Sequence, residues 1–134
     1  MTAVLVDSNV ILDIATENSQ WVRWSSDALQ EAGETSILAV NPLIYAEASI
    51  GFERVEQLEE ALPGDIFRRE PLPCEAAFLA GKCFADYRRR GGRRTSPLPD
   101  FYIGAHAVVA GYRLLTRDAA RYRTYFPRLE LIAP

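Results

Sequence analysis

Short apolar segments alternate with segments of helical pattern along the whole chain, and this alternation restricts the fold more than any other feature. Five apolar segments have the length of buried strands: Ala3–Val6, Ser36–Val40, Ile66–Phe67, Leu114–Thr116 and Leu129–Ile132. The segments between them predict helices at 10–15, 19–33, 42–51, 53–62, 73–90, 100–110 and 119–125. Strands that alternate with helices are typical of a three-layer α/β fold, in which a mostly parallel central sheet is flanked by helices.

The length of 134 residues predicts a single domain over residues 1–134, and no linker, repeat or low-complexity segment divides it. An apolar content of 49% excludes intrinsic disorder. No apolar run reaches the ~18 residues of a membrane helix, and Asp7 follows the start too closely for a secretory signal. Cys74 and Cys83 lean to different faces of one predicted helix, so we expect no disulfide. These features predict a reduced, cytoplasmic protein that enters no membrane.

Charge is divided unevenly along the chain, although the net charge is only −3. Residues 1–75 contain 14 acidic and 4 basic side chains, whereas residues 76–134 contain 4 acidic and 11 basic ones. Such an uneven distribution of charge favours binding of a polyanion, or of a partner of opposite charge. The alternative is that the two halves neutralise each other within one fold, and the sequence leaves both open.

Three aspartates are predicted at the edge of the sheet where its strands end. Asp7 follows the first strand, Asp100 opens a helix, and Asp118 follows the strand Leu114–Thr116. In open parallel sheets, ligands bind beyond this edge. Each aspartate also has a second interpretation, because Asp is a favoured N-cap of helices.

Glu47 is a fourth candidate, because the rest of its predicted helix is largely apolar. It lies close to Leu43 and Ile44, and no arginine or lysine occurs between Arg23 and Arg54. A carboxylate on an apolar face needs a cation, since burial of an unpaired charge is very costly. A bound metal would provide that cation; the alternative is that Glu47 points to solvent from a short helix.

Together the four acids favour a hard divalent cation. They offer oxygen ligands with no Cys/His set, which suits Mg²⁺ or Mn²⁺. Such ions serve phosphoryl transfer best, because they neutralise phosphate charge and activate water. The single histidine, His106, lies about 120° around the helix from Asp100, and we interpret it as structural rather than as a general base.

Four motifs occur in order along the chain: Val4–Asn9 (VLVDSN), Asn41–Glu47 (NPLIYAE), Leu98–Ala107 (LPDFYIGAHA) and Leu115–Asp118 (LTRD). In spacing and length this set resembles the PIN-domain family, and within it the VapC-type ribonuclease toxins of bacterial toxin–antitoxin pairs. The resemblance covers essentially the whole chain. It implies a parallel sheet flanked by helices, RNA cleavage that depends on Mg²⁺ or Mn²⁺, inhibition by a cognate antitoxin, and a homodimer.

The resemblance also implies roles for individual residues. The acidic site would comprise Asp7, Glu47, Asp100 and Asp118, supported by the polar side chains of Asn9 and Thr116. We expect Asp7 and Asp100 to hold the metal most directly, while Glu47 completes the shell or positions the attacking water. Asp118 corresponds to the fourth acid, which often acts through water.

Two other functions compete with this one. A PIN-like module can bind RNA or a protein without cleaving, and the residues alone do not separate that function from a nuclease. A signalling receiver domain also places acids and Mg²⁺ at the end of a parallel sheet. It requires an adjacent acidic pair after the first strand and a late lysine, whereas Ser8 follows Asp7 here and the only lysine, Lys82, lies in a helix.

Two surfaces are predicted to contact macromolecules. Arg93 and Arg94 lie beyond the glycines that end a helix, in the loop leading to Asp100, and we expect them to hold RNA together with Arg117. Trp21 and Trp24 are better explained as core. Part of their face, with the 53–62 helix, is nevertheless predicted to dock the antitoxin.

Overall fold

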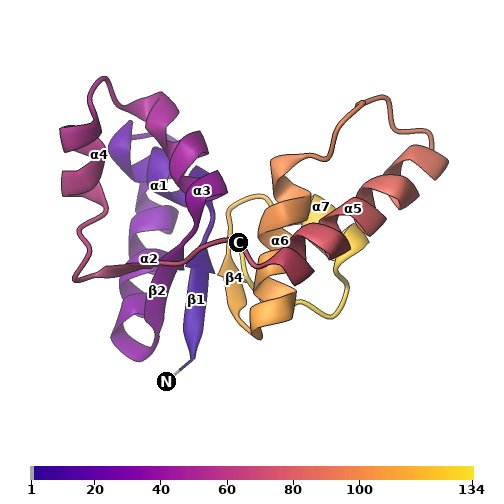
Figure 1. Cartoon of the computed structure of the whole chain (residues 1–134). Helices are drawn as coiled ribbons and strands as arrows, with labels where there is room; N and C mark the ends of the chain where they lie inside the picture. Colours follow the sequence, from indigo (N-terminus) through magenta and orange to yellow (C-terminus); the bar gives the residue numbers. More distant parts are fainter. Residues whose placement is uncertain (1) are drawn as a thin grey trace.

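A computed structural model describes residues 2–134 as a five-stranded sheet in which all neighbouring strands are parallel (Figure 1). The strands are β1 (Ala3–Val6), β2 (Ile37–Val40), β3 (Phe67–Arg69), β4 (Arg113–Leu115) and β5 (Leu131–Ile132). Their order in the sheet is β3-β2-β1-β4-β5. The α/β class and the parallel sheet flanked by helices are confirmed.

β1 lies at the centre of the sheet because all four of its residues are apolar. Each of them is at most 2% exposed. The strand pairs with β2 on one side, where Val4 lies opposite Leu38, and with β4 on the other, where Val6 lies opposite Leu115. A strand covered on both faces needs apolar side chains at every position rather than at alternate ones.

The third strand lies further along the chain than the predicted Ile66–Phe67. Phe67 is buried and begins β3, whereas Ile66 is 56% exposed and precedes it. Arg68 and Arg69 continue the strand opposite Ala39 and Val40. β3 forms an edge of the sheet, where charged side chains reach solvent and discourage further pairing. Because two of its three residues are arginines, the strand does not form an apolar run, and the sequence pattern placed it too early.

Seven α-helices and one short 3₁₀ helix connect the strands within residues 2–134. They are α1 (Ser8–Ala15), α2 (Val22–Thr35), α3 (Pro42–Ala48), η1 (Ser49–Gly51), α4 (Val55–Ala61), α5 (Cys74–Arg89), α6 (Pro99–Ala110) and α7 (Ala120–Tyr125). Every predicted helix is present, with ends shifted by a few residues. Within the same residues no helix is both long and apolar enough to span a membrane.

The chain reverses its direction across the sheet between β3 and β4. It runs from β1 through β2 to β3 at one edge, then crosses back through α5 and α6 to β4 beside β1. Because parallel crossovers are right-handed, helices before and after this reversal cover opposite faces of the sheet. The connections that leave β1 and β4 therefore diverge, and they open a crevice at the carboxyl ends of these strands.

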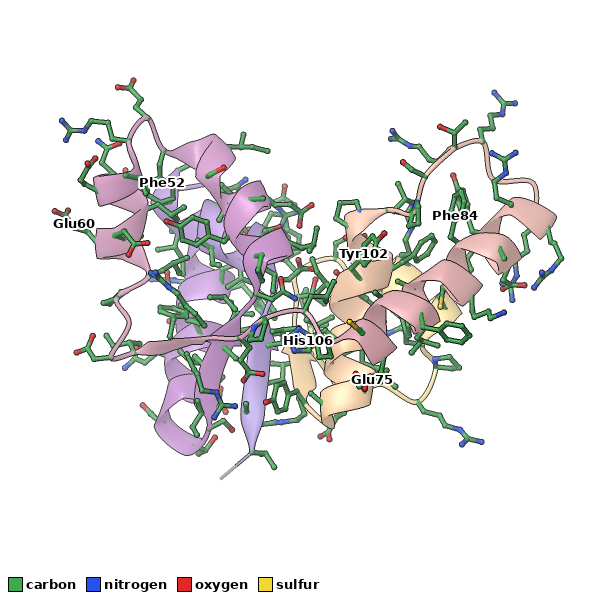
Figure 2. All side chains as sticks on the ribbon, viewed as in Figure 1. Phe52, Glu60, Glu75, Phe84, Tyr102 and His106 are labelled. Carbon is green, nitrogen blue, oxygen red and sulfur yellow. The ribbon has the colours of Figure 1, made fainter. Side chains whose placement is uncertain are left out.

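His106 joins the two parts of the fold (Figure 2). Its ring is buried in α6, and Nδ1 lies 2.9 Å from Nδ2 of Asn41, the residue that caps α3. Asn41 Oδ1 already accepts the backbone N–H of Ile44, so the amide donates to His106 Nδ1. Nε2 faces Glu70 at 3.6 Å. Burial lowers the pKa of His106, and its contacts support the predicted structural role.

Candidate active site

The crevice between β1 and β4 brings together the first and last sequence motifs. Asp7 follows β1, is 3% exposed, and donates its backbone N–H to the carbonyl of Leu115 at 2.9 Å. Its Oδ1 accepts the backbone N–H of Ser8 at 2.8 Å, so Asp7 is the N-cap of α1. The capping interpretation is confirmed for this residue, while Oδ2 remains to bind other groups.

Asp100 and Asp118 are not helix caps. Leu98 caps α6 and Pro99 begins it, which places Asp100 inside the first turn. Ala119 caps α7, so Asp118 belongs to the preceding loop. Both carboxylates reach the surface: the Asp100 side chain is 34% exposed, and Asp118 is exposed. The capping alternative is therefore wrong for these two aspartates.

Tyr122 in α7 was not predicted as a site residue, yet its hydroxyl lies between two of the acids. It donates to Asp7 Oδ2 at 2.9 Å and lies 3.3 Å from Asp100 Oδ1. The residue is 1% exposed, and burial raises its pKa well above the usual value, so it stays a proton donor. The only sequence signal for it is its position, four residues after Asp118.

Thr116 and Asn9 hold the loop after β4 against Asp7, as expected of supporting residues. The Thr116 hydroxyl donates to Asp7 Oδ2 at 2.9 Å and accepts the backbone N–H of Asp118 at 3.2 Å. Asn9 donates from Nδ2 to the same hydroxyl at 3.1 Å and accepts the backbone N–H of Arg117 at 3.0 Å. These bonds fix the orientation of Asp7 and the start of the Asp118 loop.

Glu47 reaches the site from α3 and is partly buried. Its Oε1 accepts a hydrogen bond from the Ser8 hydroxyl at 3.0 Å. Ser8 follows Asp7 directly, so this bond ties the second motif to the first. The sequence left open whether Glu47 meets a cation or points to solvent. In the structure it is partly buried and has a polar partner in Ser8, a contact that the sequence did not indicate.

The pKa values of Asp7, Glu47 and Asp100 are raised, mainly by burial and further by neighbouring carboxylates. Burial is the main cause for Asp7, whose pKa is raised from 3.8 to about 6, and the charge of Asp100 raises it further. Burial and then Asp100 also raise the pKa of Glu47. The pKa of Asp100 is raised by burial, with a smaller contribution from Asp118. Asp100 therefore lies within electrostatic reach of the other three acids, and the group carries unfavourable negative charge.

The donor set suits a hard divalent cation. Carboxylate oxygens are the ligands that Mg²⁺ and Mn²⁺ prefer, and a cation beside Asp7 and Asp100 would offset their repulsion. As the side chains stand, no three acidic, histidine or cysteine residues of the described chain converge closely enough to hold an ion. Arg121 Nη1 lies 3.6 Å from Asp100 Oδ2 and supplies part of the positive charge.

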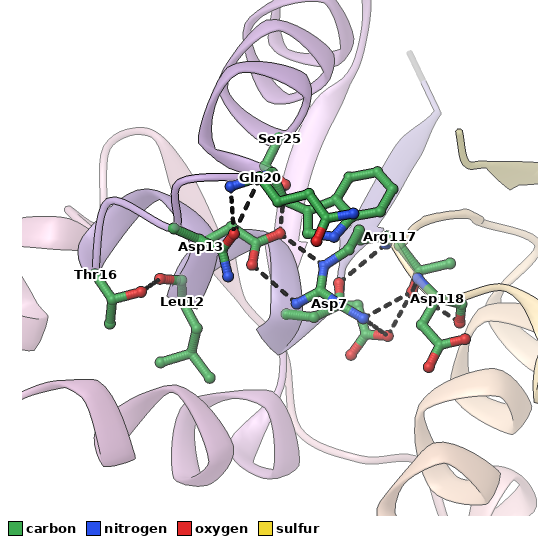
Figure 3. A network of polar contacts seen from close by, with 12 residues as sticks. Asp7, Leu12, Asp13, Thr16, Gln20, Ser25, Arg117 and Asp118 are labelled. Atoms are coloured by element: carbon green, nitrogen blue, oxygen red, sulfur yellow. Dashed lines mark hydrogen bonds and ion pairs between the residues drawn. The ribbon is translucent and has the colours of Figure 1, made fainter.

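Arg117 is partly buried and forms an ion pair with Asp13 (Figure 3). Its Nε and Nη2 donate to the two oxygens of Asp13, each at 2.9 Å, and its guanidinium lies 5.6 Å from the Trp21 ring centroid. Asp13 is 2% exposed and also accepts the Ser25 hydroxyl at 2.8 Å. The pair joins α1 to the loop after β4, so Arg117 has a structural role that the sequence did not indicate.

The remaining predicted arginines lie on the loop between α5 and α6. Arg93 and Arg94 are exposed there, and the loop leads back to Asp100 at the start of α6 (Figure 1). Arg88 at the end of α5 donates to the carbonyl of Arg94 at 2.6 Å, which folds the loop back on the helix. The structure thus places Asp7, Glu47 and Asp118 within electrostatic reach of Asp100, without three of them converging on one point. It places Arg93 and Arg94 on a neighbouring segment.

The model of the PIN domain family matches residues 4–127, which is most of the chain. The chain belongs to the PIN domain family. None of the curated proteins compared with it matches its sequence. Solved structures with low sequence identity share the fold of this chain, and three of them are described below.

VapBC2 of Rickettsia felis bound to a promoter DNA fragment has a TM-score of 0.74 at 15% identity, covering 98% of both chains. VapBC-1 of nontypeable Haemophilus influenzae has a TM-score of 0.71 at 17% identity, covering 98% of this chain and 97% of that one. A toxin–antitoxin complex of Klebsiella pneumoniae has a TM-score of 0.70 at 18% identity, covering 96% and 95%. Such likeness extends over the whole fold.

Proposed function

We propose that this PIN domain is a metal-dependent endoribonuclease and the toxin of a toxin–antitoxin pair. The observation that carries the proposal is the group of carboxylates around Asp100, at the crevice where the connections from β1 and β4 diverge. A site with concentrated negative charge repels an RNA backbone by itself. It becomes suited to phosphodiester hydrolysis when a divalent cation is bound.

Asp7 and Asp100 would hold the metal, which is Mg²⁺ or Mn²⁺, with Glu47 and Asp118 completing the site. The ion would neutralise charge on the scissile phosphate and lower the pKa of attacking water. The chain's own contribution is orientation. Thr116 and Tyr122 hold Asp7 Oδ2 in place, and Ser8 holds the carboxylate of Glu47.

RNA is the proposed substrate, and the exposed arginines on the loop from α5 to α6 would contact it. Arg93 and Arg94 do not cap the end of α5, because Gly91 adopts a positive φ of 94° and ends the helix before them. Guanidinium groups pair with phosphate oxygens in a bidentate manner. Arg117 is paired with Asp13, and its contact with RNA stays a prediction.

An antitoxin is the proposed protein partner, because a solved structure of the same fold is a toxin–antitoxin complex. The face of Trp21 and Trp24 with α4 stays a predicted docking surface. Both indoles are partly exposed, and they pack edge to face with centroids 6.4 Å apart. The cytoplasmic location and the homodimer are further predictions; light scattering on the purified protein tests the homodimer.

The proposed function is tested by brief expression in a bacterial host. We expect growth arrest and new RNA ends at defined positions, both relieved when the gene next to this one is co-expressed. The purified protein should cut the same RNA with Mg²⁺ or Mn²⁺ and stop when EDTA is added. RNA that is bound but stays intact would instead favour the non-cleaving module.

A further inference from the structure

A groove of about 400 Å³ opens beside the acids. Its walls come from α5, α6 and α7, and include Tyr87, Asp100, Asp118, Arg121, Thr124 and Tyr125. Two other recesses of similar size, one beside Tyr45 and one beside Trp24, contain none of the four acids. A ligand bound at Asp100 and Asp118 can therefore continue directly into this groove.

The groove combines a cation with an aromatic surface. Arg121 is 42% exposed and lies next to Asp100, so its remaining N–H donors reach solvent inside the groove. The Arg90 guanidinium lies 5.2 Å from the centroid of the partly exposed Tyr125 ring. Paired aromatic and guanidinium planes of this kind are surfaces on which unpaired bases stack.

One wall of the groove contacts the basic loop. Gly92 packs directly on the ring of Tyr87, where an added Cβ would lie 2.2 Å from Cε1. No larger residue fits there unless Tyr87 moves, so the glycine sets where the loop begins. Because Tyr87 also lines the groove, the segment that carries Arg93 and Arg94 begins beside it.

We propose that this groove is a subsite for single-stranded RNA. It holds the nucleotide next to the phosphodiester at the acids, with Arg121 paired to a backbone phosphate and Tyr125 with Arg90 against the base. The subsite rests on the proposed nuclease function and adds to it the strandedness of the substrate and the residues that hold it.

The size and charge of the groove favour this occupant. Its volume lies within the ~300–1,000 Å³ of small-ligand sites, which suits one nucleotide. A duplex keeps its bases stacked inside and cannot insert one into such a recess. The lining of the groove contains two carboxylates, Asp100 and Asp118, and one cation, Arg121. A divalent cation at the acids would make the sum of these charges positive, which favours a phosphate over a basic peptide.

The test measures binding of a short labelled RNA in an Asp7→Asn background, which leaves the groove residues unchanged and prevents cleavage. Arg121→Gln should reduce the slope of log affinity against log salt by ~0.7, the value for one phosphate contact of a single strand. Tyr125→Leu should weaken binding about 5- to 100-fold, the range for one lost stacking contact. Arg123→Gln is the matched control, since Arg123 is exposed on the same helix outside the groove.

Thermal unfolding first establishes that each variant is folded, and the exposed Arg121 provides a test that does not depend on Tyr125. Equal losses in Arg121→Gln and Arg123→Gln, or equal affinity for the duplex form of the RNA, would overturn the subsite. So would variants that lose affinity for the antitoxin but retain RNA. If the wild-type protein cuts RNA and groove variants bind it normally, only the subsite fails; if no variant binds RNA, the nuclease function fails with it.

Discussion

At the scale of single residues, the burial of Asp7 determines how the site behaves without metal. Its carboxylate is 3% exposed and receives only uncharged hydrogen-bond donors. In the folded protein its pKa is raised from 3.8 to about 6, so ionised Asp7 opposes folding above pH 6. Below about pH 4 the group is protonated in both the folded and unfolded states, and the effect disappears.

We therefore expect Asp7→Asn to raise the melting temperature of the metal-free protein at pH 7. A pKa raised by about two units corresponds to roughly 3 kcal/mol of lost stability at pH 7. The uncharged Asn side chain avoids this loss, but it regains only part of the stability because its amide bonds less well to Thr116 and Tyr122. Thermal unfolding in EDTA at pH 7 and pH 4 measures the gain, which should vanish at pH 4. A lower melting temperature at pH 7 would contradict the burial argument.

Tyr122 is expected to position Asp7 for the metal. Tyr122→Phe keeps the buried ring but removes a hydrogen bond to a carboxylate, worth roughly 1.5–3 kcal/mol. Because that bond lowers the pKa of Asp7, Mn²⁺ binding should weaken several-fold at pH 6 and recover at higher pH. Calorimetric titration at two pH values checks this. Tyr102→Phe on α6 is the control, and equal behaviour of the two variants would refute the role.

At the scale of elements, the Asp13–Arg117 pair holds α1 against the loop after β4. Removing one partner of a buried pair costs ~3–5 kcal/mol, because it leaves an uncompensated charge. Arg117→Met should approach that loss, since Asp13 is 2% exposed. Asp13→Asn should cost less, because Arg117 is 28% exposed and can be hydrated. Urea unfolding of both variants measures the asymmetry, and the reverse order would contradict it.

The loop between α5 and α6 is the second element with a measurable role. Replacing Arg93 and Arg94 by Gln should reduce the salt slope of RNA binding by up to ~1.4, for two phosphate contacts. The measurement uses Asp100→Asn protein at a fixed metal concentration, so that RNA is bound and not cut. An unchanged slope with unchanged affinity would assign the loop to a protein partner or to solubility.

Elements whose signals lie in adjacent residues can be predicted from the sequence. Features that depend on contacts between distant residues cannot. The apolar β1 and the Asn41–Pro42 helix start carry their signals in adjacent residues. β3 was misplaced because an edge strand tolerates Arg68 and Arg69. The acids followed from strand ends and motifs, but Tyr122 did not, since its bond to Asp7 joins residues 115 positions apart.

At the scale of the whole molecule, the strand order explains why the acids meet. β1 and β4 are neighbours although more than 100 residues separate them in the chain, and their connections diverge to opposite faces. Residues 1–75 supply Asp7 and Glu47, and the basic second half supplies Asp100, Asp118 and the arginines. Acidic side chains from both halves and a basic side chain from the second half thus meet near one crevice, where Arg121 lies 3.6 Å from Asp100.

The central claim is that Asp7 and Asp100 carry metal-dependent hydrolysis of RNA, and a cleavage assay on single-residue variants tests it most directly. Wild-type protein, Asp7→Asn and Asp100→Asn are compared on one RNA in Mg²⁺, after thermal unfolding shows that all three are folded. We expect the wild type to cut and both variants to lose cleavage. A near wild-type rate in either variant would contradict the assignment of the site.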